Sequence, residues 1–111
     1  MGSENRRARR YAAELEVRYE RASDFVREYT ENVSHGGIFV RTEQPLRTGD
    51  LVKMHIMLPG EETPLVIEGS VTHSRPQPNG LPAGMGVEFI AYNAEDVDRL
   101  QAFIARIAET E

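Results

Sequence analysis

Two short segments of the chain carry residue types that suit the binding of a small phosphorylated purine. Residues 6–10 have the sequence RRARR, and residues 32–37 have the sequence NVSHGG. Guanidinium groups match phosphate oxygens and the O6/N7 edge of guanine. Asn and Ser supply compact donors and acceptors, and glycine lets the backbone approach a ligand closely. Together the two segments predict a site for a small anionic purine ligand.

Each segment also has a simpler interpretation. An arginine-rich terminus can serve only as a solvated, solubilising arm. Asn and Ser side chains commonly close turns by bonding to nearby backbone groups, with no ligand involved. The order of the two segments, and the paired glycines that follow Asn32 and Ser34, favour contact of both with a ligand.

The elements that must position these segments are short strands followed by one helix. Alternating apolar residues or β-branched runs predict strands, with tight turns between them and Gly69 marking a bulge. In the second strand, the buried anchors are expected to be Phe25, Tyr29 and Val33. The expected strands cover residues 15–20, 25–33, 38–41, 51–58, 65–73 and 85–91, and the expected turns and loop cover 21–24, 45–50, 59–62 and 75–84.

A helix is predicted from about 94 to 108. Asn93 is its expected N-cap, with Asp96 three residues on in an arrangement like a capping box. Apolar residues then recur at helical spacing, namely Val97, Leu100, Phe103, Ile104 and Ile107. The fold class that follows is all-β with a terminal helix: a small antiparallel β-barrel of about six strands. We expect residues 1–11 to be a flexible arginine-rich N-terminal arm and residues 12–111 to be a single domain.

Composition limits the possible partners. The chain has 111 residues, no cysteine and a net charge of −5, and because the four arginines of residues 6–10 carry +4, the rest carries −9. An acidic body with one basic arm suits a small anion better than a long nucleic acid polymer. No apolar run approaches the roughly 18 residues of a membrane helix, and no signal peptide is evident. We expect a cytoplasmic domain without membrane insertion.

Neither catalysis nor metal binding has a signature in this chain. No nucleophile elbow, phosphate-binding loop or cysteine nucleophile is present. His55 and His73 fall on separate expected strands without carboxylate or thiolate neighbours, and an exposed loop position is expected for His35. The sequence therefore predicts no catalytic residue and no metal site.

Arg6-x-x-x-Arg10 followed by Asn32-x-Ser34-x-x-Gly37 resembles the two-part signature of PilZ domains, receptors for the bacterial second messenger cyclic di-GMP. The likeness extends to segments 15–19, 36–40, 45–50 and 84–89, which fall where that family has strands and turns. The resemblance implies that Arg6 and Arg10 contact guanine edges and phosphodiesters, with Asn32, Ser34 and Gly37 completing the site. Arg7, Arg9, His35 and Gly36 lie between these positions, and they either add to the site or are solvated or needed only by the turn.

The implied function is that of a non-catalytic receptor, which relays cyclic di-GMP to an unidentified protein partner in motility, pili or exopolysaccharide regulation. The alternative is a protein-interaction adaptor that has the PilZ fold but does not bind the nucleotide. One departure bears on this choice: Arg10 is followed by Tyr11-Ala12-Ala13, where many relatives have a proline, and the missing proline leaves the arm less preorganised. A nucleic-acid-binding barrel is disfavoured by the acidic body.

Overall fold

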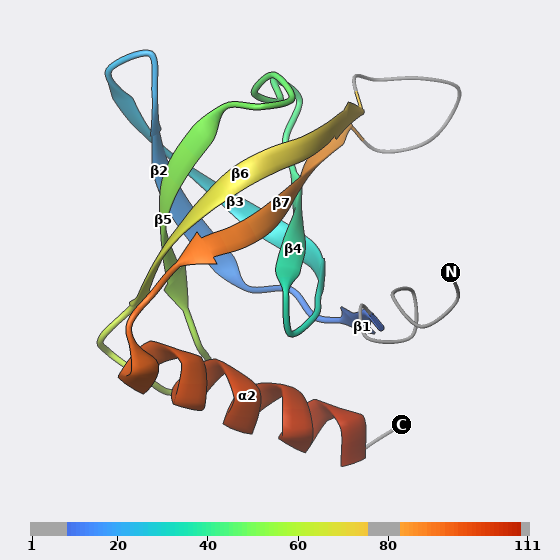
Figure 1. Ribbon diagram of the computed structural model, residues 1–111, viewed down its shortest axis with the longest axis vertical. Helices are drawn as coiled ribbons and strands as arrows, with labels where there is room; N and C mark the ends of the chain where they lie inside the picture. The colour runs from blue at the N-terminus through green and yellow to red at the C-terminus, as the bar shows by residue number, and fades with distance from the viewer. Residues whose placement is uncertain (1–8, 76–82, 110–111) are drawn as a thin grey trace.

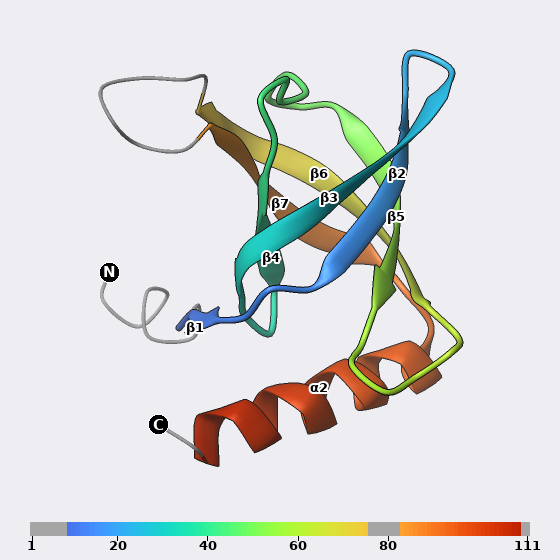
Figure 2. The same cartoon turned by 180° about the vertical axis from the view of Figure 1, so that it is seen from behind.

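The computed structural model describes residues 9–75 and 83–109; Arg6 and Arg7 lie outside this part of the chain. Six strands form a closed antiparallel barrel in the order β3-β2-β5-β6-β7-β4, and β4 pairs back with β3. A short seventh strand, β1, adds to β3, and the helix α2 lies across one end of the barrel (Figures 1 and 2). The elements are β1 (Tyr11–Ala12), β2 (Glu16–Arg21), β3 (Asp24–Val33), β4 (Gly37–Arg41), β5 (Leu51–Met57), β6 (Leu65–Arg75), β7 (Gly84–Ala91) and α2 (Ala94–Glu109). The predicted small barrel with a C-terminal helix is confirmed.

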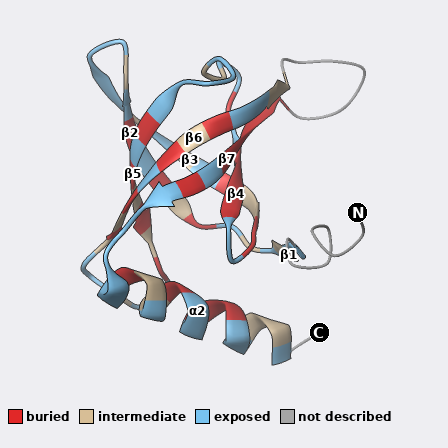
Figure 3. Cartoon of the chain, in the orientation of Figure 1, coloured by how far each residue is buried: buried red, intermediate tan, exposed pale blue. Residues whose placement is uncertain are grey.

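Strand alternation builds the core, as the banded burial of the strands in Figure 3 shows. On β2 the side chains of Val17 and Tyr19 are fully buried, while Arg18 between them is exposed. The same alternation holds along β5, where Val52, Met54 and Ile56 face inward as expected. Each such burial contributes about 1.5–3 kcal/mol, so the period-two pattern fixes which face of every strand points into the barrel.

The strand β3 departs from the expected pattern. Val33 is buried, but Phe25 is 72% exposed and Tyr29 is 41% exposed, so the prediction of these two as core anchors is wrong. Their neighbours in the opposite phase, such as Thr30, point inward instead. A register shift between Thr30 and Asn32 inserts one extra residue, Glu31, which reverses the phase and returns Val33 to the core.

Left-handed backbone closes the predicted turns. Ala22 and Ser23 join β2 to β3 with φ values of 53° and 76°, and Gly49 and Gly60 have φ values of 97° and 78° in the turns before β5 and after it. The pairing of β6 with β7 does shift between Glu68 and Gly69, but the extra residue is Ile90 of β7, so the irregularity lies opposite Gly69 rather than at it. The loop expected over 75–84 is shorter at both ends, since β6 runs to residue 75 and β7 begins at residue 84; residues 76–82 lie outside the described part.

Asn93 caps the helix α2 as predicted, but Asp96 attaches the helix to the barrel and does not form the predicted capping box. The Asn93 Oδ1 accepts the Asp96 N–H at 2.7 Å, which confirms the N-cap. The Asp96 carboxylate does not complete a capping box; its Oδ2 accepts the Val66 N–H of β6 at 3.0 Å, and its Oδ1 accepts Arg99 Nη1 at 3.1 Å. This buried carboxylate therefore fastens the first turn of the helix to the barrel, while Leu100 and Ile104 pack on the core.

Candidate functional site

The two predicted halves of the site meet where β1 joins β3. Tyr11 pairs with Val33, and Ala12 pairs with Asn32, in an antiparallel arrangement. Arg10, the residue before β1, donates from Nη1 to the Asn32 Oδ1 at 2.8 Å across 22 positions of sequence. The structure thus brings Arg10 and Asn32 into direct contact on an exposed surface.

Arg9 lies on the same short arm. Its guanidinium carbon is 5.0 Å from the centroid of the Tyr11 ring, a cation–π distance. Tyr11 is half-buried and packs against the hydrophobic core together with Ala13 and Ile107 of α2. Arg9 and Arg10 therefore stand on a segment whose next residue is anchored to the barrel.

Ser34 has a structural role that the sequence offered only as the simpler interpretation. Its side chain is buried, and its hydroxyl oxygen accepts the N–H groups of Gly36 at 3.2 Å and Gly37 at 3.1 Å. The hydroxyl is also 3.3 Å from the Gly37 carbonyl oxygen, to which it donates. Ser34 closes the turn between β3 and β4 and so sets the position of Asn32 at its start.

The two glycines of this turn differ in what they require. A Cβ on Gly37 would overlap the carbonyl oxygen of Val87, so the close approach of β4 to β7 demands glycine there. A Cβ on Gly36 would meet nothing within 4 Å. His35 and Gly36 form the exposed tip of the turn, and the Gly36 carbonyl accepts the Phe89 N–H at 2.9 Å.

A group of side chains on the outer face of β4 and β6 extends this surface, and sequence reasoning missed it. Phe39 is opposite Asn32 on one side and Gly86 on the other, and Gly86 is opposite His73, so the four residues form one row across four strands. The Phe39 and His73 ring centroids are 5.7 Å apart. Arg75, two residues further along β6, places its guanidinium carbon 4.4 Å from the Phe39 centroid. These residues meet only through long-range strand register, which no local motif signals.

Glycines on β7 make room for this row. A Cβ on Gly84 would overlap the Phe39 ring, and a Cβ on Gly86 would overlap the His73 ring. Phe39 does not belong to the hydrophobic core cluster, yet it is only 5% exposed. The Phe39 and His73 rings therefore pack against the bare backbone of β7, and the Arg75 guanidinium lies over the Phe39 ring next to Asn32.

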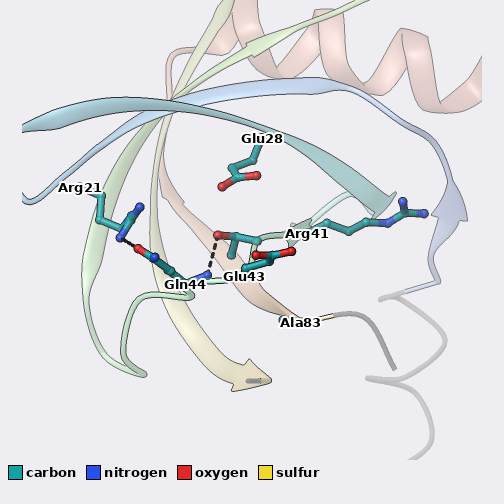
Figure 4. A pocket seen from close by; sticks show the side chains of 7 residues that line it. Arg21, Glu28, Arg41, Glu43, Gln44 and Ala83 are labelled. Atoms are coloured by element: carbon teal, nitrogen blue, oxygen red, sulfur yellow. Dashed lines mark hydrogen bonds between the residues drawn. The ribbon is translucent and has the colours of Figure 1, made fainter. Parts of the chain in front are cut away.

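A hollow of about 540 Å³ lies apart from this surface and is shown in Figure 4. Two arginines and two glutamates line it, so its formal charges cancel. Arg21 donates from Nη1 to the side-chain oxygen of Gln44. The backbone N–H of Gln44 in turn donates to Thr42 Oγ1 at 3.1 Å. The lining consists of Arg21, Glu28, Arg41, Thr42, Glu43, Gln44 and Ala83. None of the predicted site residues belongs to it, and its balanced charge does not favour an anion.

Over residues 9–75 and 83–109, no group of three or more His, Asp or Glu side chains is arranged to hold a metal ion. In the same ranges, no helix is both long enough and apolar enough to cross a membrane.

The fold and the surface around Asn32 define a class: a small antiparallel barrel with a capping helix, which presents arginines and a glycine turn on one outer face. Residues 4–106 match the PilZ domain family, and the chain belongs to this family. PilZ domains are receptors for cyclic di-GMP and are generally non-catalytic. The matched range includes both halves of the predicted signature.

Solved structures agree on the fold. The chain is 27% identical to the Bacillus subtilis inhibitor of motility MotI/DgrA, with a TM-score of 0.76 over 92% of this chain and 50% of that one. It superposes on K. pneumonia MrkH in its apo state with a TM-score of 0.74 at 16% identity, over 93% of this chain and 50% of that one. It also superposes on the PilZ domain of Escherichia coli YcgR with cyclic di-GMP, with a TM-score of 0.71 at 15% identity, over 94% and 92% of the two chains. The chain thus spans half the length of MotI/DgrA and MrkH. No curated protein sequence matches it.

Proposed function

We propose that this domain is a receptor for cyclic di-GMP, and that it binds the nucleotide between the arginine arm and the turn of residues 32–37. The observation that carries the proposal is the hydrogen bond between Arg10 and Asn32, which joins the two halves of the signature. Family membership supports the ligand, because PilZ domains are cyclic di-GMP receptors.

The residues divide the work of binding between them. Arg10 and Arg6 supply planar guanidinium forks, which suit a phosphodiester or a guanine edge better than lysine would. Asn32 lies beside Arg10, and its side-chain amide can donate hydrogen bonds to a nucleotide as well as accept them from it. Ser34 and Gly37 hold the turn in shape, and the exposed His35 and Gly36 stand at its tip.

The relay of the signal begins at β1 in this proposal. Ordering the arm over a ligand costs about 1–2 kcal/mol per residue for the backbone, so charge-assisted contacts must offset that cost. Tyr11 and Ala13 pack on the core beside Ile107 of α2. A ligand that fixes residues 6–10 therefore changes a surface shared by the arm and the helix end, which a protein partner can recognise.

Calorimetric titration of cyclic di-GMP into the purified domain tests this proposal. The wild type should bind saturably, and the Arg6→Ala/Arg10→Ala variant should lose at least about tenfold in affinity, because charge-assisted hydrogen bonds are removed. Arg18→Ala is the matched control, since Arg18 is an exposed arginine on β2 that pairs with Glu16 at 2.6 Å and lies outside the site.

The competing function is that of an adaptor which uses the barrel only for protein contacts. The missing proline after Arg10 favours it, because the arm is then less preorganised for a ligand. Absence of heat from the wild type at millimolar cyclic di-GMP would overturn the receptor function and leave the adaptor.

A further inference from the structure

Arg75 stands next to the proposed nucleotide site although it belongs to neither half of the signature. Its guanidinium lies over Phe39, the cross-strand neighbour of Asn32. Its Nη2 is 3.4 Å from Oε1 of Glu31, the residue before Asn32. Strands β3, β4 and β6 therefore bring a third arginine to the edge of the site.

The bulge in β3 explains why Glu31 and Asn32 share the outer surface. Thr30 points inward, so Glu31 faces outward by the regular alternation of a strand. Because the pairing with β4 shifts between Thr30 and Asn32, Asn32 does not turn inward after Glu31, and both side chains lie on the outer face. The backbone of Glu31 also holds the arm, since the Glu31 carbonyl accepts the Ala13 N–H at 3.4 Å.

We propose that Arg75 is a further ligand-binding arginine of the same site, and that Glu31 restrains it until a phosphodiester replaces the Glu31 carboxylate. This inference rests on the proposed function. A carboxylate and a phosphodiester both present anionic oxygens to a guanidinium, so the contact of Arg75 Nη2 with Glu31 Oε1 at 3.4 Å marks a place that a phosphate oxygen could take. The guanidinium carbon is 4.4 Å from the Phe39 ring centroid, and this cation–π contact holds the guanidinium next to Asn32.

The charges of Glu31 and Arg75 decide whether each residue raises or lowers the affinity for a nucleotide. The side chains of Arg75 and Glu31 are 28% and 36% exposed, so their pairing is partly screened and contributes little to stability. A nucleotide phosphate approaching Arg75 has to displace this carboxylate and is also repelled by it. Glu31 therefore lowers the affinity, whereas Arg75 raises it.

Titration of cyclic di-GMP into variants of the whole chain tests both assignments. Arg75→Gln should weaken binding at least about tenfold, through loss of a charge-assisted contact. Arg75→Lys should also weaken binding, because it keeps the charge and the stem but not the stacked fork. Glu31→Gln should tighten binding about two- to fivefold, the range expected for releasing an exposed ion pair. Glu16→Gln and Arg18→Gln, at an ion pair on β2, a strand that carries no residue of the proposed site, should leave binding unchanged.

The double variant Glu31→Gln/Arg75→Gln separates restraint from simple repulsion. If Glu31 acts through Arg75, its gain should disappear in the Arg75→Gln background. A gain that persists there would overturn the restraint, and wild-type affinity in both folded Arg75 variants would overturn the third arginine, with circular dichroism checking the fold. If the wild type itself takes up no cyclic di-GMP, the receptor function and this inference fall together; a binding wild type with an unchanged Arg75→Gln contradicts only the inference.

Discussion

At Gly37 the signature and the packing of the barrel require the same residue for different reasons. The motif assigns this glycine to the ligand, yet its missing Cβ also lets β4 approach the Val87 carbonyl. Ser34 has the same double character, because its buried hydroxyl closes the turn that carries Asn32. Part of the signature is therefore needed to build the surface that we propose for the ligand, whether or not these atoms touch a ligand.

Paired alanine substitutions in the turn separate the two glycines. Gly37→Ala should lower the free energy of unfolding by about 1–3 kcal/mol, because the new Cβ overlaps a backbone atom that cannot rotate away. Gly36→Ala should change it by less than about 0.5 kcal/mol, because the space beside Gly36 is open. Urea denaturation of both variants measures the difference; equal destabilisation would contradict the conclusion that the approach of β4 to β7 is what requires glycine at position 37.

Among the elements, the strands and the helix follow from the sequence, while the site follows only in part. Local alternation predicted β2 and β5, which bury alternate residues, and the β-branched and aromatic run of residues 38–41 predicted β4. Alternation failed on β3, where the inserted Glu31 changes the phase and a window of alternating residues cannot detect the change. The stack of Phe39, His73 and Arg75 could not be predicted, because it depends on the register between β4, β6 and β7 rather than on any local pattern.

The hairpin between β2 and β3 offers a test at the same scale. Its two turn residues, Ala22 and Ser23, both have positive φ, a conformation that costs a residue with a Cβ about 1–2 kcal/mol. Ser23→Gly should therefore raise the free energy of unfolding by about 0.4–1 kcal/mol. Thermal unfolding checks this, with Ser70→Gly in the middle of β6 as the control that should destabilise; a lower melting temperature for Ser23→Gly would contradict the turn geometry.

For the molecule as a whole, one buried hydroxyl links stability to alkaline pH. Tyr19 is fully buried, and its hydroxyl forms no hydrogen bond of normal geometry, although the Thr42 side chain lies nearby. Burial raises the pKa of Tyr19 above its ordinary value of 10.0, an effect that Thr42 partly offsets. The folded protein thus keeps this proton where the unfolded chain loses it. The contribution to stability is complete below pH 10.0 and is lost as the pH rises towards the higher pKa of the folded state.

Replacing this tyrosine removes the linkage. Tyr19→Phe should match or exceed the wild-type stability at neutral pH, because it deletes an unsatisfied buried polar atom, and its stability should fall less between pH 9 and 11. Denaturation of both proteins across this range provides the measurement, and Tyr92→Phe, at an exposed tyrosine, should behave like the wild type. An unchanged alkaline decline in Tyr19→Phe would mean that other groups cause it.

The pairing of β1 with β3 also sets a local concentration. Because Tyr11 and Ala12 are fixed beside Asn32, Arg6 is tethered by the few residues that separate it from β1. The five steps from Arg6 to Tyr11 span at most about 18 Å when fully extended, so Arg6 lies no further than this from the start of β1. A group on so short a tether acts at an effective concentration on the order of millimolar or above. If Arg10 engages a nucleotide as we propose, engagement by Arg6 is an intramolecular step, and two weak contacts would combine into one strong one.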